Sequence, residues 1–273
     1  MADVHPSTAP HLAAAVQSVV ARIRAAAPLV HSITNYVVMN TTANALLALG
    51  ASPAMVHALD EVEDFTSISS ALVVNIGTLS PLWVTAMQRA AVRANERGIP
   101  WVLDPVGAGA TAYRTDTARA LLALRPTILR GNASEILAVA GEAGGTKGVD
   151  STAGSDAALE AATRIAQQHQ CTVVITGAID LATDGARVVH CGNGHPLMPR
   201  VTGLGCSLSA LTGACLAVET DALHAAAAAL AIAGTAGEVA AERAKGPGTL
   251  QLEMLDALYQ LTPAEFAAKA RLW

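Results

Sequence analysis

Short apolar runs alternate with longer amphipathic stretches through most of the chain. The clearest apolar runs are ALVVNIG at residues 71–77, WVLDPV at 101–106 and CTVVITG at 171–177, and each has the length of a buried strand. Between them, apolar residues recur every three or four positions, as on the buried face of a helix. This alternation predicts an α/β fold with a mostly parallel central sheet that is flanked by helices on both faces.

Capping residues, glycines and prolines place the ends of the elements in the first half of the chain. The expected elements are a helix near residues 9–26, a strand at 29–30, a polar loop with the sequence HSITN, a helix that ends at Gly50, a strand around 54–56 and a helix from Asp60 through Ser69. Ser80 and Pro81 fit the N-cap and first turn of a helix that reaches Arg97.

The second half of the chain continues the pattern and ends in helices. LATDGARVVHCGNGH predicts a hairpin with its turn at Asp184 and Gly185, so the sheet should gain an antiparallel edge late in the chain. The apolar stretch over residues 222–237 falls short of the length needed to span a bilayer and is predicted to be a core helix. Since no linker or repeat interrupts the sequence, we expect a single domain over residues 1–273.

Composition and charge narrow the classes of partner. Apolar residues make up 52% of the chain and aromatic residues only 3%, and the formal charge is −5 with three lysines, so no basic surface with aromatic platforms is available for nucleic acid. The four cysteines lack the paired spacing of a zinc site, and the N-terminus lacks the features of a secretion signal. We therefore expect a cytoplasmic protein that binds small molecules, with neither nucleic acid nor membrane as a partner.

The segment VTGLGC at residues 201–206 is the strongest candidate for chemistry. Gly203 and Gly205 precede a helix of small residues, where unpaired backbone amides and the positive end of the helix dipole favour an anion such as phosphate. Cys206 would then stand at the rim of a phosphate-binding turn. The alternative is that the glycines only make a tight turn and that Cys206 is a small buried side chain.

Two acidic residues lie where ligands bind in open α/β sheets, beyond the carboxyl ends of strands. Asp104 ends the run WVLDPV, where it could instead only cap the loop VGAGATAYRT. Glu135 follows Asn132 by three residues, after the predicted strand that carries Arg130. Asp104 and Glu135 could together organise a divalent cation. The spacing of Asn132 and Glu135 also fits a capping box, and spacing alone favours that structural explanation.

Six segments resemble hydroxyethylthiazole kinases of the ribokinase-like superfamily, in the same order and over nearly the whole chain. They are PLVHSITNYVVMNTTANALLALGASPAM, ALVVNIGTL, LDPVGAGAT, ILRGNASEI, ITGAID and VTGLGCSLSALTGA. The resemblance implies a homotrimer with active sites between neighbouring subunits. It also implies transfer of the γ-phosphoryl group of ATP to the primary alcohol of 4-methyl-5-(2-hydroxyethyl)thiazole, a reaction of thiamin salvage.

The resemblance assigns roles to individual residues. It implies that the turn formed by Leu204, Gly205 and Cys206 is catalytic. It implies that Arg130 and Thr176 bind ATP and that Asp104 and Glu135 bind Mg²⁺. The substrate-binding residues that it implies are Met55, Gly203 and Asn35. Sugar kinases of this fold usually carry an aspartate base after the glycines, whereas this chain has Cys206, as the thiazole kinases do. Whether Cys206 acts as a base or only lines the anion site is left open, because a helix start lowers a thiol pKa and nearby phosphates raise it.

Four other functions compete with this interpretation. A related kinase of the same fold could act on hydroxymethylpyrimidine or pyridoxal, or a repair hydratase could use the nucleotide, but Cys206 and the HSITN and ASPAM segments argue against these enzymes. A sensor could bind ATP or thiazole without turnover. An acyltransferase or hydrolase built on Cys206 lacks a histidine in the local motif.

Overall fold

The computed structural model describes residues 9–142 and 152–273 of the chain. The strands of the described residues form one sheet in the order β2-β1-β3-β4-β5-β6-β7-β8. Their bounds are β1 Leu29–Ile33, β2 Ser52–Ala54, β3 Ala71–Asn75, β4 Trp101–Asp104, β5 Ile128–Asn132, β6 Thr172–Thr176, β7 Asp180–Thr183 and β8 Val188–Cys191. Strands β1 to β6 pair in parallel, and β7 and β8 add the antiparallel edge that the sequence predicts.

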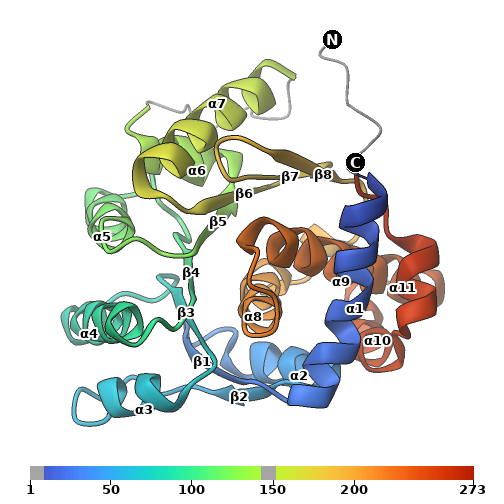
Figure 1. Cartoon of the computed structure of the whole chain (residues 1–273), viewed down its shortest axis with the longest axis horizontal. Coiled ribbons are helices and arrows are strands. Elements are labelled where there is room, and N and C mark those ends of the chain that lie inside the picture. Colours follow the sequence, from blue (N-terminus) through green and yellow to red (C-terminus); the bar gives the residue numbers. More distant parts are fainter. Residues whose placement is uncertain (1–8, 143–151) are drawn as a thin grey trace.

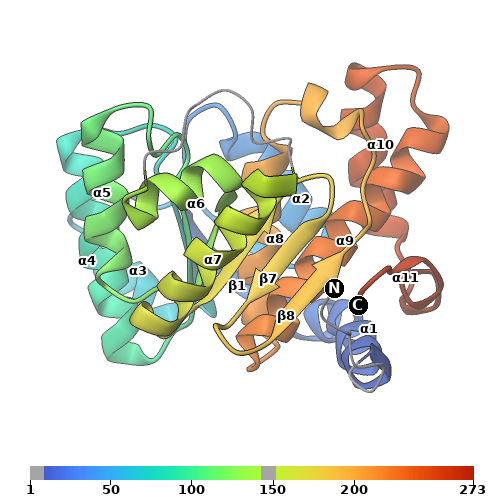
Figure 2. The same cartoon turned by 90° about the horizontal axis from the view of Figure 1, so that it is seen from above.

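Helices cover both faces of the sheet (Figure 1). Their bounds are α1 Ala9–Ala26, α2 Met39–Leu49, α3 Val62–Ile68, α4 Pro81–Arg97, α5 Ala112–Leu122, α6 Ala133–Ala140, α7 Thr152–His169, α8 Leu204–Leu216, α9 Ala222–Arg243, α10 Pro247–Gln260 and α11 Pro263–Lys269, with a short 3₁₀ helix at Met198–Arg200. Helices α3 to α7 pack on one face, and α1, α2 and α8 to α11 lie on the other, as the view from above also shows (Figure 2). Two separate apolar cores fill these layers.

Helix α8 is the centre of one layer, because it packs against β1, β3 and β4 on one side and against α9 on the other. Its residues Ser207 to Leu216 are all buried. A Cβ at Gly213 would lie 2.6 Å from Val73 on β3, so a glycine is needed for this close approach. This packing fixes the start of α8, which carries the glycines of the VTGLGC segment, at the carboxyl edge of the sheet.

Most of the expected helix ends are confirmed. Gly50 ends α2 with a φ of 106°, Ser80 caps α4 by accepting from the Trp83 amide, and Asn132 and Glu135 form both halves of a capping box on α6. The hairpin turn at Asp184 and Gly185 is also confirmed, since it joins the antiparallel strands β7 and β8.

Four local expectations are wrong. His31, Ser32 and Ile33 continue β1 instead of forming a loop, because the neighbouring strands β2 and β3 pair with these residues. Helix α3 begins at Val62 with no side-chain cap, so Asp60 does not cap it. Strand β2 lies at 52–54, two residues earlier than expected.

The fourth correction concerns α9. The helix continues to Arg243, so its 22 residues are long and apolar enough to cross a membrane, contrary to the length argument. However, 78% of its most apolar window is buried inside the fold. It is therefore the core helix that the sequence predicts.

Candidate active site

Polar side chains from consecutive strands meet at the carboxyl edge of the sheet. Asn35 follows β1, Asn75 and Asp104 end β3 and β4, and Arg130 and Thr176 lie on β5 and β6. The strand order reverses direction at β1, which lies between β2 and β3. Ligands of open α/β sheets bind beyond such a switch point, so the fold itself places these residues at the expected binding crevice.

A chain of hydrogen bonds joins three of these residues. The Asn35 Nδ2 group donates to Asn75 Oδ1 over 2.9 Å, and Asn75 Nδ2 donates to Asp104 Oδ2 over 2.8 Å. All three side chains are buried. Asn35 also approaches Gly77 so closely that a Cβ there would lie 2.5 Å from its Nδ2 atom. The Asn35 amide is therefore held in one orientation from two sides.

Asp104 is a fully buried carboxylate with unequal oxygens. Its Oδ2 atom accepts from Asn75 and, over 2.7 Å, from the hydroxyl of Ser209 on α8, whereas its Oδ1 atom is buried and has no hydrogen-bond partner. Burial raises the pKa of Asp104 to about 6, although the nearby Arg130 charge lowers it. Burial thus disfavours the charged carboxylate, and its Oδ1 atom is left with room for a further polar or cationic partner.

Arg130 connects this carboxylate to the next strand. Its guanidinium lies 3.8 Å from Asp104 Oδ2 and donates to the Thr176 hydroxyl over 3.0 Å, while its buried Nε atom has no partner. A Cβ at Gly205 would lie 3.2 Å from the guanidinium, so the glycine lets the start of α8 lie directly against it. The structure thus brings the two predicted ATP-binding residues, Arg130 and Thr176, into contact. They lie beside residues 203–206 at the start of α8, the glycine turn.

The glycine turn presents backbone amides at the start of α8. Gly203 is the N-cap with a φ of 88°, and it has no side chain to accept from the first amides of the helix, those of Leu204, Gly205 and Cys206. A Cβ at Gly203 would lie 2.6 Å from Val38 Cγ1, so both the conformation and the space require glycine. These amides and the positive end of the dipole of α8 suit an anion.

Cys206 belongs to the glycine turn, and its thiol lies close to Asn35 and Asn75. Its Sγ atom accepts from Asn35 Nδ2 over 3.5 Å. Burial raises the pKa of the Cys206 thiol, and the Asp104 charge raises it further, while hydrogen bonds from Asn75 and Asn35 lower it. The net direction is upward, so Cys206 is a neutral thiol at neutral pH.

Both carboxylate oxygens of Glu135 are hydrogen-bonded to backbone amides. Oε2 accepts from Asn132 in the capping box, and Oε1 accepts from Gly107 in the loop after β4 over 2.8 Å. The structural explanation that the spacing favours is therefore confirmed. Glu135 is also close enough to Asp104 to raise its pKa, so the two carboxylates share one electrostatic environment.

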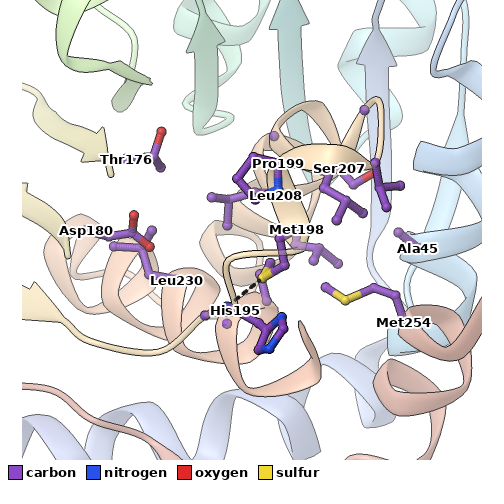
Figure 3. Close-up of a pocket in the computed structure, with 18 of the residues that line it drawn as sticks. Ala45, Thr176, Asp180, His195, Met198, Pro199, Ser207, Leu208, Leu230 and Met254 are labelled. Atoms are coloured by element: carbon purple, nitrogen blue, oxygen red, sulfur yellow. Dashed lines mark hydrogen bonds between the residues drawn. The ribbon is translucent and has the colours of Figure 1, made fainter. Parts of the chain in front are cut away.

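A cavity of about 860 Å³ opens beside the glycine turn. Its lining includes Arg130, Thr176, Gly203, Leu204 and Gly205 among the predicted site residues. Apolar side chains from α8, α9 and α10 line much of the rest. Figure 3 shows Thr176 and Asp180 on one side of the cavity and Ala45 and Met254 on the other. The volume suits a nucleotide whose phosphates reach the glycine turn.

Two of the three predicted thiazole-binding residues, Asn35 and Met55, lie away from this cavity, whereas the third, Gly203, lines it. Asn35, Met55 and Cys206 are not among its lining residues. Met55 is half-buried in the loop after β2, and the adjacent Val56 carbonyl accepts from the buried imidazole of His31 on β1 over 2.7 Å. The glycine turn therefore lies between the cavity, which Gly203 and Gly205 line, and Asn35, which contacts Cys206.

Several site residues escape an interpretation based on sequence patterns. Asn75 and Ser209 hold Asp104, and Arg114 donates to the carbonyl oxygens of Ile76, Val106 and Gly77, which orders the loops after β3 and β4. An asparagine at the end of the apolar run ALVVNIG is a signal for Asn75, because a polar residue rarely ends a buried strand without a partner. Ser209 has no comparable signal within its small-residue helix.

The parallel sheet, the amide-rich turn and the arginine beside a buried carboxylate define a small-molecule kinase of the ribokinase-like class. The fold is shared with the ADP complex of Bacillus subtilis pyridoxal kinase at 18% identity and a TM-score of 0.60, covering 76% of this chain and 90% of that one. It is shared far more closely with the structure of a hydroxyethylthiazole kinase from Pyrococcus horikoshii OT3. That comparison gives a TM-score of 0.88 at 44% identity and covers 94% of this chain and 98% of the other.

Sequence comparisons agree with the structural ones. The hydroxyethylthiazole kinase family model matches residues 20–264. A hydroxyethylthiazole kinase of Syntrophus aciditrophicus is 58% identical over 252 residues, which cover 92% of this chain and 93% of that protein. The chain therefore belongs to the hydroxyethylthiazole kinase family, and the predicted fold class is confirmed. Membership of a kinase family implies that the chain is a phosphotransferase that uses ATP.

Proposed function

We propose that this chain transfers the γ-phosphoryl group of ATP to the primary alcohol of 4-methyl-5-(2-hydroxyethyl)thiazole, the phosphorylation step of thiamin salvage. The observation that carries the proposal is the meeting of Arg130, Asp104 and the glycine turn at one edge of the sheet. Phosphoryl transfer requires little covalent chemistry of the protein, but it requires positioning and neutralisation of phosphate charge. Arg130 and the amides of the turn supply both, and Asp104 is placed to hold a cation that would neutralise further phosphate charge.

In this proposal the triphosphate of ATP lies on the glycine turn and its nucleoside enters the large cavity. The amides of Leu204, Gly205 and Cys206 hold phosphate oxygens, and Arg130 neutralises their charge while Thr176 fixes the orientation of the guanidinium. The cavity lies next to the same turn, which supports this placement. The alcohol oxygen attacks the γ-phosphorus from the opposite side, and the bond to the β-phosphate oxygen breaks as ADP leaves.

We propose that Asp104 and Glu135 hold Mg²⁺, in part through water. The unpartnered Asp104 Oδ1 atom and the electrostatic coupling of the two carboxylates support this assignment, because Mg²⁺ prefers oxygen ligands and is often bound by one or two carboxylates. No cluster of three or more His, Cys, Asp or Glu side chains in the described residues offers a more complete metal site. When bound, the ion would neutralise charge on the phosphate oxygens.

Asn35, Met55 and Gly203 contact the thiazole in this proposal, with the hydroxyethyl arm directed at the glycine turn. The fixed Asn35 amide, held by Asn75 and close to Cys206, supports the placement of the alcohol there. The raised pKa of Cys206 supports a role as a neutral side chain that lines the anion site. In a loose transition state the alcohol proton leaves late and passes to a phosphoryl oxygen or to water, so a strong base is not required.

The working form that we propose is a homotrimer of one-domain chains, with active sites between subunits. Tyr36 and Val37 follow Asn35 directly, and Tyr36 packs on Trp83, yet their exposed fractions are 64% and 71% and that of nearby Leu82 is 67%. Apolar side chains that are exposed next to Asn35 support the proposal that a second subunit covers this surface. We place the enzyme in the cytoplasm, where its four free cysteines would stay reduced.

A coupled assay of ADP release tests the proposal. Purified protein with ATP and magnesium is given the thiazole alcohol, the hydroxymethylpyrimidine alcohol or pyridoxal in separate reactions. We expect rapid turnover with the thiazole alcohol alone, and mass spectrometry should detect its phosphate ester. Faster turnover with either other alcohol would assign the chain to a related kinase, and nucleotide binding without turnover would identify a sensor.

A further inference from the structure

The segment Lys269–Trp273 returns to the antiparallel edge of the sheet and pairs with β8 (Figure 2). The His190 amide donates to the Trp273 carbonyl over 2.9 Å, and the Gly192 amide donates to the Arg271 carbonyl over 2.9 Å. The rings of His190 and Trp273 stack at 5.5 Å with an angle of 11° between their planes. This tail lies beyond residues 20–264, the part of the chain that the family model matches.

Arg271 extends the contact from β8 to the segment that follows it. Its guanidinium pairs with Glu238 on α9 and donates to the Gly192 carbonyl, and its backbone amide donates to Asn193 Oδ1 over 2.7 Å. Glu238 completes the group, because its Oε1 atom accepts from the Gly194 amide over 2.8 Å. The Asn193 side-chain amide also donates to the two Glu238 oxygens, over 3.4 and 3.3 Å, so the ion pair contacts three consecutive residues, Gly192 to Gly194.

Two glycines of α9 let this same segment lie directly on the helix. A Cβ at Gly234 would lie 2.5 Å from Asn193 Cβ and 2.7 Å from its carbonyl carbon, and a Cβ at Gly237 would clash with the side chain of Met198. Gly234, Gly237 and Glu238 share one face of α9, since they are three and four residues apart. The segment 193–198 is therefore fixed between α9 and the tail.

The fixed segment is a wall of the nucleotide-sized cavity and leads into the glycine turn. Asn193, Gly194, His195 and Met198 all line the cavity, and the chain continues through the 3₁₀ helix at Met198–Arg200 to Gly203. Figure 3 shows His195 and Met198 side by side in this wall, joined by a hydrogen bond. Glu238 and Arg271 are not among the lining residues, so they contact the wall from outside the cavity.

We infer that the Glu238–Arg271 ion pair is a positioning device for nucleotide binding, which holds the 193–198 wall in the place that the nucleoside requires. The inference rests on the proposed use of this cavity for ATP. Because neither side chain reaches the cavity, loss of the pair should weaken nucleotide affinity and leave the alcohol site and the transfer step in place. The side chain of Arg271 is 52% exposed, so removal of its charge should not unfold the protein.

The test compares Arg271→Met with Arg271→Lys and with a control, Arg187→Met. Met keeps the apolar stem of Arg271 without its charge, and Lys restores the charge. Arg187 is a half-exposed arginine paired with Asp184 and Asp221 on another surface. The measurements are ADP affinity by calorimetry and steady-state KM and kcat for ATP and for the thiazole alcohol, with thermal denaturation to establish that each variant is folded.

We expect Arg271→Met to raise the ADP Kd and the ATP KM by about three- to tenfold, with kcat and the alcohol KM within about twofold of the parent. Arg271→Lys should recover most of the affinity, and Arg187→Met should match the parent. Unchanged ADP affinity in folded Arg271→Met, or an equal effect of Arg187→Met, would overturn the inference. A parent that binds ADP without thiazole turnover would overturn the proposed function alone, and a parent without nucleotide binding would overturn both.

Discussion

Asn75 and Asp104 are register partners on neighbouring parallel strands, and the Asn75 amide donates to Asp104 Oδ2 over 2.8 Å. The orientation of this amide is determined by its other end, since Asn75 Oδ1 accepts from Asn35 Nδ2 and from the Gly77 amide. Asn75 therefore links the proposed thiazole side of the site to the proposed Mg²⁺ side. The Asn75 side chain is buried at the carboxyl end of β3.

Asn75→Ala should slow catalysis and also lower the stability of the fold. The substitution removes one donor from the buried Asp104 carboxylate and frees the Asn35 amide, so we expect kcat to fall on the order of 10- to 100-fold. The unfolding free energy should fall by about 1–3 kcal/mol, because a buried hydrogen bond is lost at both ends. Steady-state kinetics and chemical denaturation measure the two effects. Asn44→Ala, which removes a hydrogen bond between α2 side chains, should change neither kcat nor nucleotide affinity.

The sheet and its order of layers could be predicted because buried strands and amphipathic helices differ in period and length. The ends of individual strands and helices are harder to predict where the same residues are compatible with both a strand and a loop. The run HSITN is polar enough to suggest a loop, yet His31 and Ser32 are buried in β1, where tertiary pairing outweighs polarity. The length of α9 was underestimated because Glu238 and Arg243 continue the helix at its polar end.

The site was predictable where a motif is local in sequence. The glycine turn, Arg130 and Asp104 each stand next to a recognisable strand or helix end, and the structure brings them together. Ser209 belongs to the site only because α8 packs on β4, a contact between residues 105 positions apart. No local pattern encodes such a contact, so its discovery needed the fold.

Arg130→Ala should weaken the use of ATP strongly. The variant loses a charge-assisted contact to phosphate worth about 2–3 kcal/mol, which corresponds to a fall of about 30- to 150-fold in kcat/KM for ATP. Arg130→Lys should recover only part, because an ammonium group cannot both donate to Thr176 and bind phosphate with the same geometry. A steady-state titration with ATP measures the change. Unchanged ATP dependence in the alanine variant would refute the assignment, and Arg164→Ala, at an exposed ion pair of α7, is the control.

Cys206→Asp should retain or improve turnover, and Cys206→Ala should lose only part of it. A thiol whose pKa is raised by burial and by Asp104 contributes little as a base, and an aspartate at this position could accept from Asn35 in place of sulfur. Steady-state turnover of both variants tests this expectation. Complete inactivity of a folded aspartate variant would instead show that the thiol has a specific role.

The same reasoning predicts slow alkylation of Cys206. Only the thiolate reacts readily with iodoacetamide, and the raised pKa keeps its fraction low at neutral pH. Cys171, Cys191 and Cys215 are buried, so mass spectrometry of the intact folded protein reports mainly on Cys206. A rate above that of a free cysteine at pH 7 would contradict a neutral thiol.

The buried imidazole of His31 should make the folded state sensitive to acid. Burial lowers the pKa of His31 to about 4, although its hydrogen bond to the Val56 carbonyl raises it. In the unfolded chain the pKa returns to about 6.5, so between these values the unfolded state binds a proton that the folded state does not. The stabilising contribution is therefore complete above about pH 6.5 and is lost as the pH falls towards 4.

His31→Gln should remove this part of the pH dependence. The difference of about 2.5 pKa units corresponds to at most about 3 kcal/mol of unfolding free energy between pH 6.5 and 4. Gln keeps a donor for Val56 but loses the contact of the imidazole with the Thr66 hydroxyl, so the variant should be less stable at pH 7. Because Gln does not titrate, the stability of the variant should fall less steeply with acid. Urea denaturation of parent and variant at several pH values measures both slopes, and parallel slopes would mean that His31 is protonated equally in both states. Because His31 orders Val56 next to Met55, the variant should also raise the KM for the thiazole alcohol more than the KM for ATP.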